Sequence, residues 1–162
     1  MMTARIEHPF PPVVDADCHV LILGSFPSVK SREDGFFYGH PQNRFWKVLA
    51  TVFSEPVPQD IPARKALLLR HHIALWDVIA SCEITGSSDA SVKAAIPVDI
   101  ARLTQNAVIS RVLCNGALAG KLYVRHLESQ VGIPADILPS TSPANAAWTL
   151  DRLISAWGSA LK

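Results

Sequence analysis

The chain has 162 residues, of which 49% are hydrophobic and 18% are charged. This length supports one substantial core and leaves no room for a second domain, so we expect a single domain over 1–162 with an N-terminal extension over 1–17. Fifteen Lys and Arg against fourteen Asp and Glu give a net charge of +1, far from the basic balance that by itself indicates nucleic-acid binding. Charge alone therefore neither supports nor excludes a DNA partner.

The composition also argues against a membrane, a metal and a disulfide framework. Segment 1–12 lacks the apolar core of a signal peptide, and the apolar runs are far shorter than the roughly twenty residues of a membrane helix. Cys18, Cys82 and Cys114 are widely spaced and form no C-x-x-C pair. His71 and His72 are adjacent, so on a helix they point about 100° apart and do not converge on an ion. We expect a cytoplasmic protein without metal, cofactor or membrane partner.

Strand-like and helix-like segments alternate along the chain, which is typical of a parallel sheet covered on both faces. The fold class that this pattern predicts is α/β, a three-layer α/β/α sandwich with a central four-stranded parallel sheet. We place the four strands, in chain order, at 19–23, 73–76, 108–114 and 135–138.

The helices are predicted from the spacing of their apolar residues. The first covers 43–53, with Pro41 in its opening turn, and the second covers 63–72. The third covers 117–129, after a polar loop at 86–91. The last begins at Ser142-Pro143 and shares one apolar face among Leu150, Leu153, Ile154, Trp157 and Leu161.

Ligands of open parallel sheets bind beyond the carboxyl ends of the strands. The site should therefore lie in the loops that follow Leu23, Trp76, Cys114 and Leu138. The first of these loops carries G-S-F-P-S at 24–28 and then G-H-P-Q-N-R-F-W at 39–46.

These two strings resemble the first motif of the uracil-DNA glycosylase superfamily, and most closely its hypoxanthine-DNA glycosylase branch, also called DNA-deoxyinosine glycosylase. A second match, L-P-S-T-S-P-A-N-A at 138–146, is similar to the Pro/Ser loop by which these enzymes press into the DNA minor groove. Segments 74–79 and 114–116 fall in the expected order, so the resemblance spans nearly the whole chain from Val20 onward.

The resemblance implies a monofunctional DNA glycosylase of base excision repair that hydrolyses the N-glycosidic bond of deaminated bases. Hypoxanthine is the first expected substrate, in double-stranded DNA that carries deoxyinosine, and a uracil or mismatch-specific activity is the alternative. We expect a monomer. No lysine sits where a Schiff base would form, so the abasic strand should stay intact.

An enzyme that acts on a base must extrude it from the stack and hold it in a closed pocket. Tyr38 is the candidate for stacking on the extruded base, and Gly35 and Gly39 would let the backbone approach the ligand closely. The neighbouring Phe36 and Phe37 are equally consistent with an ordinary core.

Asn43 is the candidate catalytic residue. Cleavage passes through a sugar with oxocarbenium character, so a water must be placed against it, and an amide can accept a hydrogen bond from water and fix its direction. The alternative is that Asn43 caps its helix. The resemblance carries Asn43 onto the asparagine regarded as important in the hypoxanthine branch.

Phe26 departs from other branches, which have Asp or Asn at that position to activate water. This argues against a standard uracil enzyme and leaves the water to Asn43 or to backbone carbonyls. The backbone N–H groups of Ser25 and Phe26, after the turn at Gly24, are candidates for stabilising the departing base. The alternative is a plain turn from strand to loop.

Asp77 ends the second predicted strand, where uracil-specific relatives resemble it in position but have asparagine. A carboxylate can accept from N1–H of hypoxanthine, so we predict that Asp77 reads this edge of the base; the alternative is a cap on the following turn. His40 either bonds within the pocket or caps the turn before Pro41. Asn115 is assigned to the base pocket by the resemblance.

DNA contacts are expected from hydroxyl and backbone groups of the Pro/Ser loop at Pro139, Ser140, Thr141, Ser142 and Pro143. A structural role at Ser142-Pro143, as helix cap and first helical residue, is compatible with this. Weaker candidates for phosphate contacts are Ser87, Ser88 and Ser91. Plausible members of the basic set that follows the DNA backbone are Lys30, Arg32, Arg44 and Lys47.

Two other classes of protein are alternatives to a DNA glycosylase. A serine hydrolase is disfavoured because segment 24–28 lacks the second glycine of a G-x-S-x-G elbow. A catalytically silent DNA- or nucleotide-binding module on the same fold stays open, since a fold does not prove activity. Such a module would retain damaged DNA without releasing a base.

Overall fold

The computed structural model describes residues 4–162 and is built around a four-stranded parallel sheet. The strand order is β3-β2-β6-β7, and every neighbouring pair is parallel. The first three strands are almost entirely buried, as expected for apolar strands covered on both faces. The four strands are β2 (Val20–Gly24), β3 (Ile73–Asp77), β6 (Arg111–Asn115) and β7 (Ala135–Leu138).

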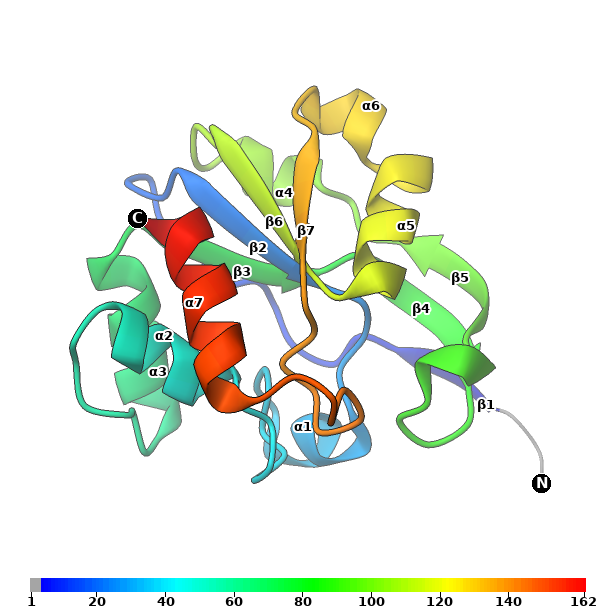
Figure 1. Cartoon of the computed structure of the whole chain (residues 1–162). Helices are drawn as coiled ribbons and strands as arrows, with labels where there is room; N and C mark the ends of the chain where they lie inside the picture. The colour runs from blue at the N-terminus through cyan, green and yellow to red at the C-terminus, as the bar shows by residue number, and fades with distance from the viewer. Residues whose placement is uncertain (1–3) are drawn as a thin grey trace.

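The connections from β2 to β3 and from β6 to β7 run in opposite directions across the sheet. Right-handed crossovers in opposite directions place their helices on opposite faces. Figure 1 shows α2, α3 and α7 at one face and α5 at the other, so the predicted α/β/α sandwich is confirmed. The helices of these connections are α1 (Val29–Asp34), α2 (Phe45–Val52), α3 (Ile61–Arg70), α5 (Ala117–His126) and α6 (Glu128–Val131).

The last helix, α7 (Leu150–Leu161), begins eight residues later than the predicted start at Ser142. Its cap is Thr149, whose side chain accepts from the Arg152 N–H. Ser142 caps only a turn, since its Oγ accepts from the Ala144 N–H at 3.1 Å. The predicted apolar face is still correct at its centre, because Leu153 and Trp157 are fully buried.

A second sheet was not predicted. It is antiparallel, in the order β1-β4-β5, and consists of β1 (Ala4–Glu7), β4 (Ile79–Ile84) and β5 (Lys93–Pro97). The segment 4–17, expected as an extension, therefore supplies a strand, and Val13 also exchanges two backbone hydrogen bonds with Leu75 of β3. Residues 1–3 of that expected extension lie outside the described residues.

Smaller differences concern the ends of elements. The predicted helix at 117–129 is divided into α5 and α6 by Leu127. A short 3-10 helix, η1 (Asp89–Ser91), and α4 (Ala101–Thr104) lie between β4 and β6. In the part of the chain from residue 4 onward, no helix is long and apolar enough to cross a membrane.

Candidate active site

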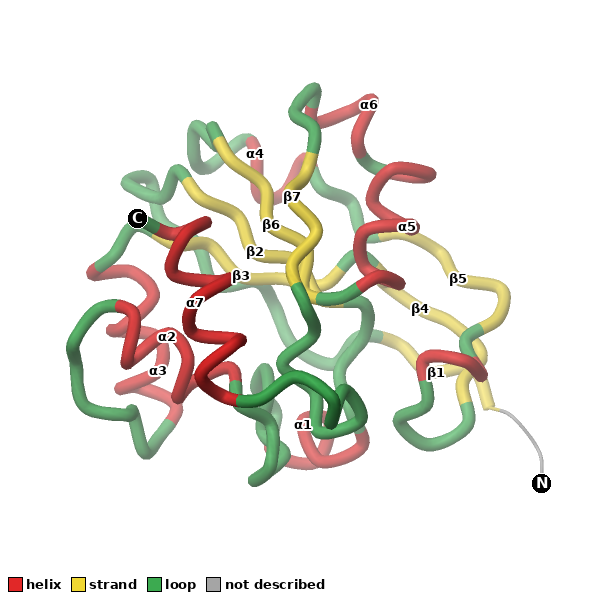
Figure 2. Tube along the Cα trace, viewed as in Figure 1, coloured by secondary structure: helices red, strands yellow, loops and turns green. Residues whose placement is uncertain are grey.

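The carboxyl ends of β2 and β6 form the point where the strand order reverses, which is where ligands of open sheets bind. Figure 2 shows the long connections gathered at this edge. A pocket of about 1210 Å³ lies there. It brings together most of the predicted site residues, namely Gly24, Ser25, Phe26, Tyr38, His40, Asn43, Asp77, Ser87, Ser88, Asn115, Pro139, Ser140, Thr141, Ser142 and Pro143. The predicted residues that do not line it are Gly35, Gly39, Ser91, Lys30, Arg32, Arg44 and Lys47.

Gly24, Asp77 and Tyr38 crowd together at the base of the pocket. A Cβ atom on Gly24 would lie 2.4 Å from Asp77 Oδ1 and 2.8 Å from Tyr38 Oη. Real Cβ atoms do not approach other heavy atoms so closely, so only glycine fits between these two side chains. Asp77 and Tyr38 can therefore approach the end of β2 closely only because Gly24 has no side chain.

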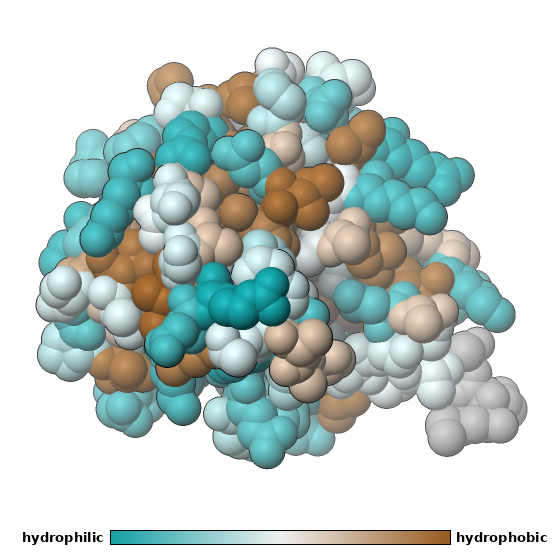
Figure 3. Space-filling view, viewed as in Figure 1, coloured by the Kyte–Doolittle hydropathy of each residue, from teal (hydrophilic) through white to brown (hydrophobic). Residues whose placement is uncertain are grey.

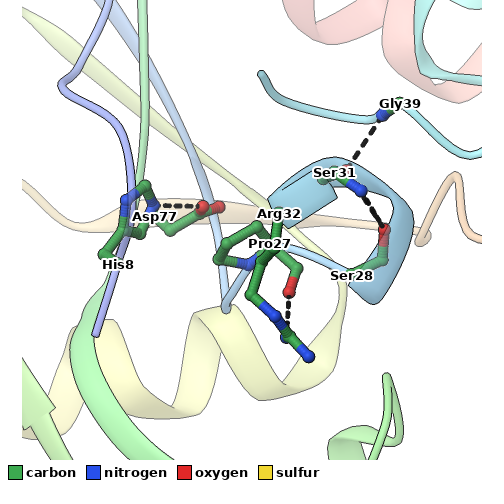
Figure 4. A network of polar contacts seen from close by, with 7 residues as sticks. All are labelled: His8, Pro27, Ser28, Ser31, Arg32, Gly39 and Asp77. Carbon is green, nitrogen blue, oxygen red and sulfur yellow. Dashed lines mark hydrogen bonds and ion pairs between the residues drawn. The ribbon is translucent and has the colours of Figure 1, made fainter. Parts of the chain in front are cut away.

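Tyr38 has a left-handed backbone, with φ of 53°, that a non-glycine residue rarely adopts. The next residue is tied to α1: the Gly39 N–H donates to Ser31 Oγ at 2.9 Å (Figure 4). Ser31 is itself bound to Ser28, the cap of α1. The short helix α1 thus holds the backbone that presents Tyr38 to the pocket.

The ring of Tyr38 stacks on Phe45 of α2, with centroids 4.1 Å apart and an angle of 24° between planes. Its Oη is buried and makes no hydrogen bond to any described residue. Burial raises the pKa of Tyr38, and the negative charge of Asp77 raises it further, so the phenol stays neutral. The ring offers the pocket an uncharged, firmly supported aromatic surface.

Asn43, Thr141 and Asn115 form a chain of hydrogen bonds across the pocket wall. The Asn115 amide donates to Thr141 Oγ1 at 3.0 Å, and its oxygen accepts from the Thr141 N–H at 3.0 Å. The Thr141 hydroxyl then donates to Asn43 Oδ1 at 2.9 Å. Thr141 is fully buried, so it acts as an internal link between the end of β6 and the loop before α2.

These hydrogen bonds determine which atom of the Asn43 side chain is free to contact a ligand. Its Oδ1 also accepts from the Phe45 N–H at 3.0 Å, so two donors fill the two lone pairs of this oxygen. Because a backbone N–H only donates, the bond fixes which end of the amide is the oxygen. The helix contact that was the alternative to catalysis therefore exists, and the amide group left for the pocket is a donor, Nδ2.

Asp77 is buried and bonded to His8, a residue that belongs to none of the motifs. His8 Nε2 lies 2.8 Å from Asp77 Oδ2, and the two side chains are only 6% and 4% exposed (Figure 4). The partners are 69 positions apart and meet only because β1 pairs with β4. The other oxygen, Oδ1, is the one that lies against Gly24.

Asp89 is a second pocket carboxyl that sequence reasoning missed, although it stands in the polar loop after Ser87 and Ser88. Ser25 Oγ donates to Asp89 Oδ1 at 3.2 Å. Desolvation raises the pKa of Asp89, the hydrogen bond from Ser25 lowers it, and the charge of Asp77 raises it. The rim of the pocket is therefore held together partly by this Ser–Asp contact.

Several predicted ligand-binding side chains have structural partners. His40 Nδ1 accepts from the Gln42 N–H at 3.1 Å, so it caps the turn before Asn43. Ser87 Oγ accepts from the Val29 N–H at 2.9 Å. Arg32 donates to the carbonyl of Pro27 (Figure 4) and to that of Gly86, which ties the first pocket loop to the polar loop.

Arg44, proposed from the sequence as a DNA-backbone contact, instead holds the Pro/Ser loop. Its guanidinium donates to the carbonyls of Ser142, at 2.9 Å, of Asn145, at 3.1 Å, and of Trp148. Its backbone N–H donates to the Thr141 carbonyl. A planar guanidinium can reach several carbonyls at once, which explains why this loop stays in place without being helical.

We expect Arg44→Lys to loosen the Pro/Ser loop, because one ammonium cannot span three carbonyls. Each lost bond to a charged donor is worth about 1.5–3 kcal/mol, so the free energy of unfolding should fall measurably in the absence of DNA. Thermal unfolding of the free protein measures this. Lys47→Ala is the control, because Lys47 is exposed on α2 and should leave the midpoint unchanged. If Arg44→Lys is as stable as the wild-type protein but binds DNA more weakly, Arg44 contacts DNA as the sequence predicts.

The face around β7 borders the pocket with apolar surface. Figure 3 shows apolar atoms over β7 between α5 and α7. Ile137 of β7 is 54% exposed and lines the pocket together with Leu138 and Pro139. Across the described residues 4–162, no group of three or more His, Cys, Asp or Glu side chains gathers as a metal site would require.

Comparison with known proteins places the chain in a family. The sequence profile of the Uracil DNA glycosylase superfamily matches residues 11–158. The chain belongs to this superfamily. The resemblance carried by segments 24–28 and 39–46 is therefore confirmed, and with it the expectation of a DNA glycosylase.

Individual relatives match over nearly the whole chain. A hypoxanthine DNA glycosylase of Methanosarcina acetivorans is 32% identical over 149 residues, covering 91% of this chain and 93% of that protein. One of Methanosarcina barkeri is 34% identical over 155 residues, covering 94% and 96%. A solution NMR structure of a candidate uracil DNA glycosylase from Methanosarcina acetivorans superimposes with a TM-score of 0.79 at 32% identity, covering 96% of each chain.

Proposed function

We propose that this protein removes hypoxanthine from double-stranded DNA by hydrolysing the bond between the base and its sugar. The observation that carries the proposal is the convergence of Tyr38, Asn43 and Asp77 on one pocket beside the Pro/Ser loop. The relatives named hypoxanthine DNA glycosylase support the choice of base. Uracil is the second candidate substrate, which the NMR neighbour favours.

In this proposal the base leaves the stack and enters the pocket with its hydrogen-bonding edge leading. It stacks on the Tyr38 ring, which Phe45 supports from the other side. N1–H of hypoxanthine donates to Asp77 Oδ1, the carboxylate oxygen that faces Gly24. Adenine presents a lone pair at the same position, so the carboxylate repels the undamaged base.

Hydrolysis then needs a water on one side of the sugar and a stabilised base on the other. Asn43 Nδ2 donates to the water oxygen and leaves a lone pair of that water free to attack C1′. The N–H groups of Ser25 and Phe26 donate to no other described group, so they are free to stabilise the charge that develops on the departing base. The C1′–N9 bond breaks with its electron pair going to the base, and the water oxygen bonds to C1′ and loses a proton to solvent. The base anion then takes up a proton from solvent.

The Pro/Ser loop, residues 139–143, contacts the DNA backbone in this proposal and keeps the duplex bent toward the pocket. Ser140 and Ser142 supply hydroxyl groups, whereas Thr141 is buried and supports the loop from within. None of the described residues that line the pocket is a lysine, so in this proposal the reaction proceeds without a Schiff base and leaves the strand intact. The protein acts as a monomer.

The test uses labelled duplexes with one deoxyinosine, one deoxyuridine or no lesion, incubated with the wild-type protein and a chelator. Strands are resolved with and without alkali. The proposal predicts cleavage at deoxyinosine that depends on alkali, with slower cleavage at deoxyuridine. Cleavage at deoxyuridine alone would make this a uracil enzyme. Retention of the deoxyinosine duplex without base release would make it a binding module.

A further inference from the structure

His8 contacts the pocket through Asp77. The ring lies in a cage of Phe10, Phe26 and Phe37, with centroids 4.7, 5.9 and 6.0 Å away. Its Nε2 is within hydrogen-bond distance of Asp77 Oδ2, at 2.8 Å, and both side chains are almost fully buried. A carboxylate only accepts, so His8 Nε2 is the donor of this bond.

The bond divides the two oxygens of Asp77 between two tasks. Oδ2 is committed to His8, whereas Oδ1 bonds to no other described residue and lies beside Gly24 at the base of the pocket. Rotation of the carboxyl group would break a buried, charge-assisted hydrogen bond. His8 therefore determines which oxygen the pocket presents and in which direction its lone pairs point.

The imidazole is costly as a packing group alone. Its Nδ1 is buried and has no partner among the described residues. An apolar ring of the same size would fill the cage between the phenylalanines without leaving a nitrogen unsatisfied. What distinguishes His8 from such a ring is the single bond that it makes to Asp77.

The position of His8 is set by strand pairing. β1 pairs with β4 so that Glu7 lies opposite Ser81, and the His8 N–H donates to the Ala80 carbonyl at 2.7 Å. Figure 4 shows the ring reaching Asp77 from this N-terminal segment. The superfamily profile begins at residue 11, so His8 precedes the region by which the family is recognised.

We propose that His8 is a positioning residue for base recognition: it orients Asp77 so that Oδ1 accepts the ring N–H of the extruded base. This rests on the proposed function, because it assumes that Asp77 reads N1–H of hypoxanthine. His8 does not touch the base. It acts on the base through Asp77, so its effect disappears when the carboxylate is absent.

The test is a double-mutant cycle on hypoxanthine excision under single-turnover conditions. His8→Phe fills the aromatic cage but has no donor, His8→Gln restores a donor near Nε2, and both are combined with Asp77→Ala. We expect His8→Phe to lower the excision rate roughly 10- to 100-fold and His8→Gln to recover most of it. In the Asp77→Ala background, His8→Phe should change the rate less than about twofold.

Binding to a duplex with a tetrahydrofuran abasic analogue separates positioning from folding. This ligand has no base for Asp77 to read, so His8→Phe should bind it as tightly as the wild-type protein. Weaker binding of the analogue by both His8→Phe and His8→Gln would overturn the proposal, because it would indicate general damage to the site. Equal losses from His8→Phe with and without Asp77 would also overturn it.

The outcomes distinguish this inference from the proposed function. A wild-type protein that excises hypoxanthine, with His8→Phe unchanged, would overturn only the role of His8. If the wild-type protein excised uracil alone, the proposed substrate would be wrong. The same double-mutant cycle on deoxyuridine would then test the role of His8, because uracil N3–H is the same kind of donor. A wild-type protein that excises neither base would overturn both.

Discussion

Asn43→Ala should lower the rate of hypoxanthine excision about 10²- to 10³-fold, which is the usual effect of removing one donor directed at a reacting group. The free part of Asn43 is Nδ2, because Phe45 N–H and the Thr141 hydroxyl both donate to Oδ1. The substitution also leaves those two donors without an acceptor, which should reduce the free energy of unfolding by about 1–3 kcal/mol. The catalytic loss is measured as the single-turnover rate at a temperature well below the midpoint of thermal unfolding.

Asn43→Asp is the matched variant, because a carboxylate keeps the acceptor for Phe45 and Thr141 and removes only the donor. Its thermal stability should stay close to that of the wild-type protein while its excision rate falls nearly as far as that of Asn43→Ala. An aspartate variant as fast as the wild-type protein would contradict the donor role. It would show instead that an acceptor or base at this position activates the water.

Gly24→Ala should lower both the stability of the protein and the rate of excision, because it adds a side chain at the base of the pocket. The new Cβ would lie 2.4 Å from Asp77 Oδ1 and 2.8 Å from Tyr38 Oη. Neither neighbour can yield freely, since Asp77 is bonded to His8 and Tyr38 is stacked on Phe45. Overpacking of this kind costs about 1–3 kcal/mol of stability, and a displacement near 1 Å at a reacting site lowers the rate roughly 10²-fold.

Gly158→Ala is the control for this substitution. In α7 its Cβ would meet only Val52 Cγ2, at an ordinary 3.7 Å. Excision should be unchanged, and stability should rise by about 0.5–1 kcal/mol because alanine favours the helix. Both proteins are compared in the same excision assay and by thermal unfolding. A Gly24→Ala enzyme as active as the Gly158→Ala enzyme would mean that the base does not enter between Gly24, Asp77 and Tyr38.

Local pattern was sufficient to predict the central sheet and the location of the pocket. Three of the strands, β2, β3 and β6, are runs of mainly apolar residues that lie buried on both faces. The carboxyl ends of the four strands bring the loops after Gly24, Asp77, Asn115 and Leu138 together. The motif at 39–46 contains Asn43, which lines this pocket. Its role as helix contact was also anticipated, because an asparagine just before a helix has a local partner in sequence.

The missed features depend on contacts between segments far apart in sequence. His8 meets Asp77 only after β1 pairs with β4. β1 is only four residues long, and β4 shows no alternation of apolar and polar residues. The late start of α7 is similar: Ser142-Pro143 has the local pattern of a helix start, but Arg44, about a hundred positions away, bonds to the carbonyls of the following turns. Local propensity is overridden there by a tertiary contact.

We propose that an extruded hypoxanthine enters this one pocket and that its bond to the sugar is hydrolysed there. Quantification of free base by mass spectrometry, from a duplex with a single deoxyinosine and a slight excess of protein, tests it most directly. We expect the wild-type protein to release one hypoxanthine for each lesion and to leave the abasic strand uncut, and Asn43→Asp to release almost none in the same time. Tight binding of the duplex without any free hypoxanthine would contradict it.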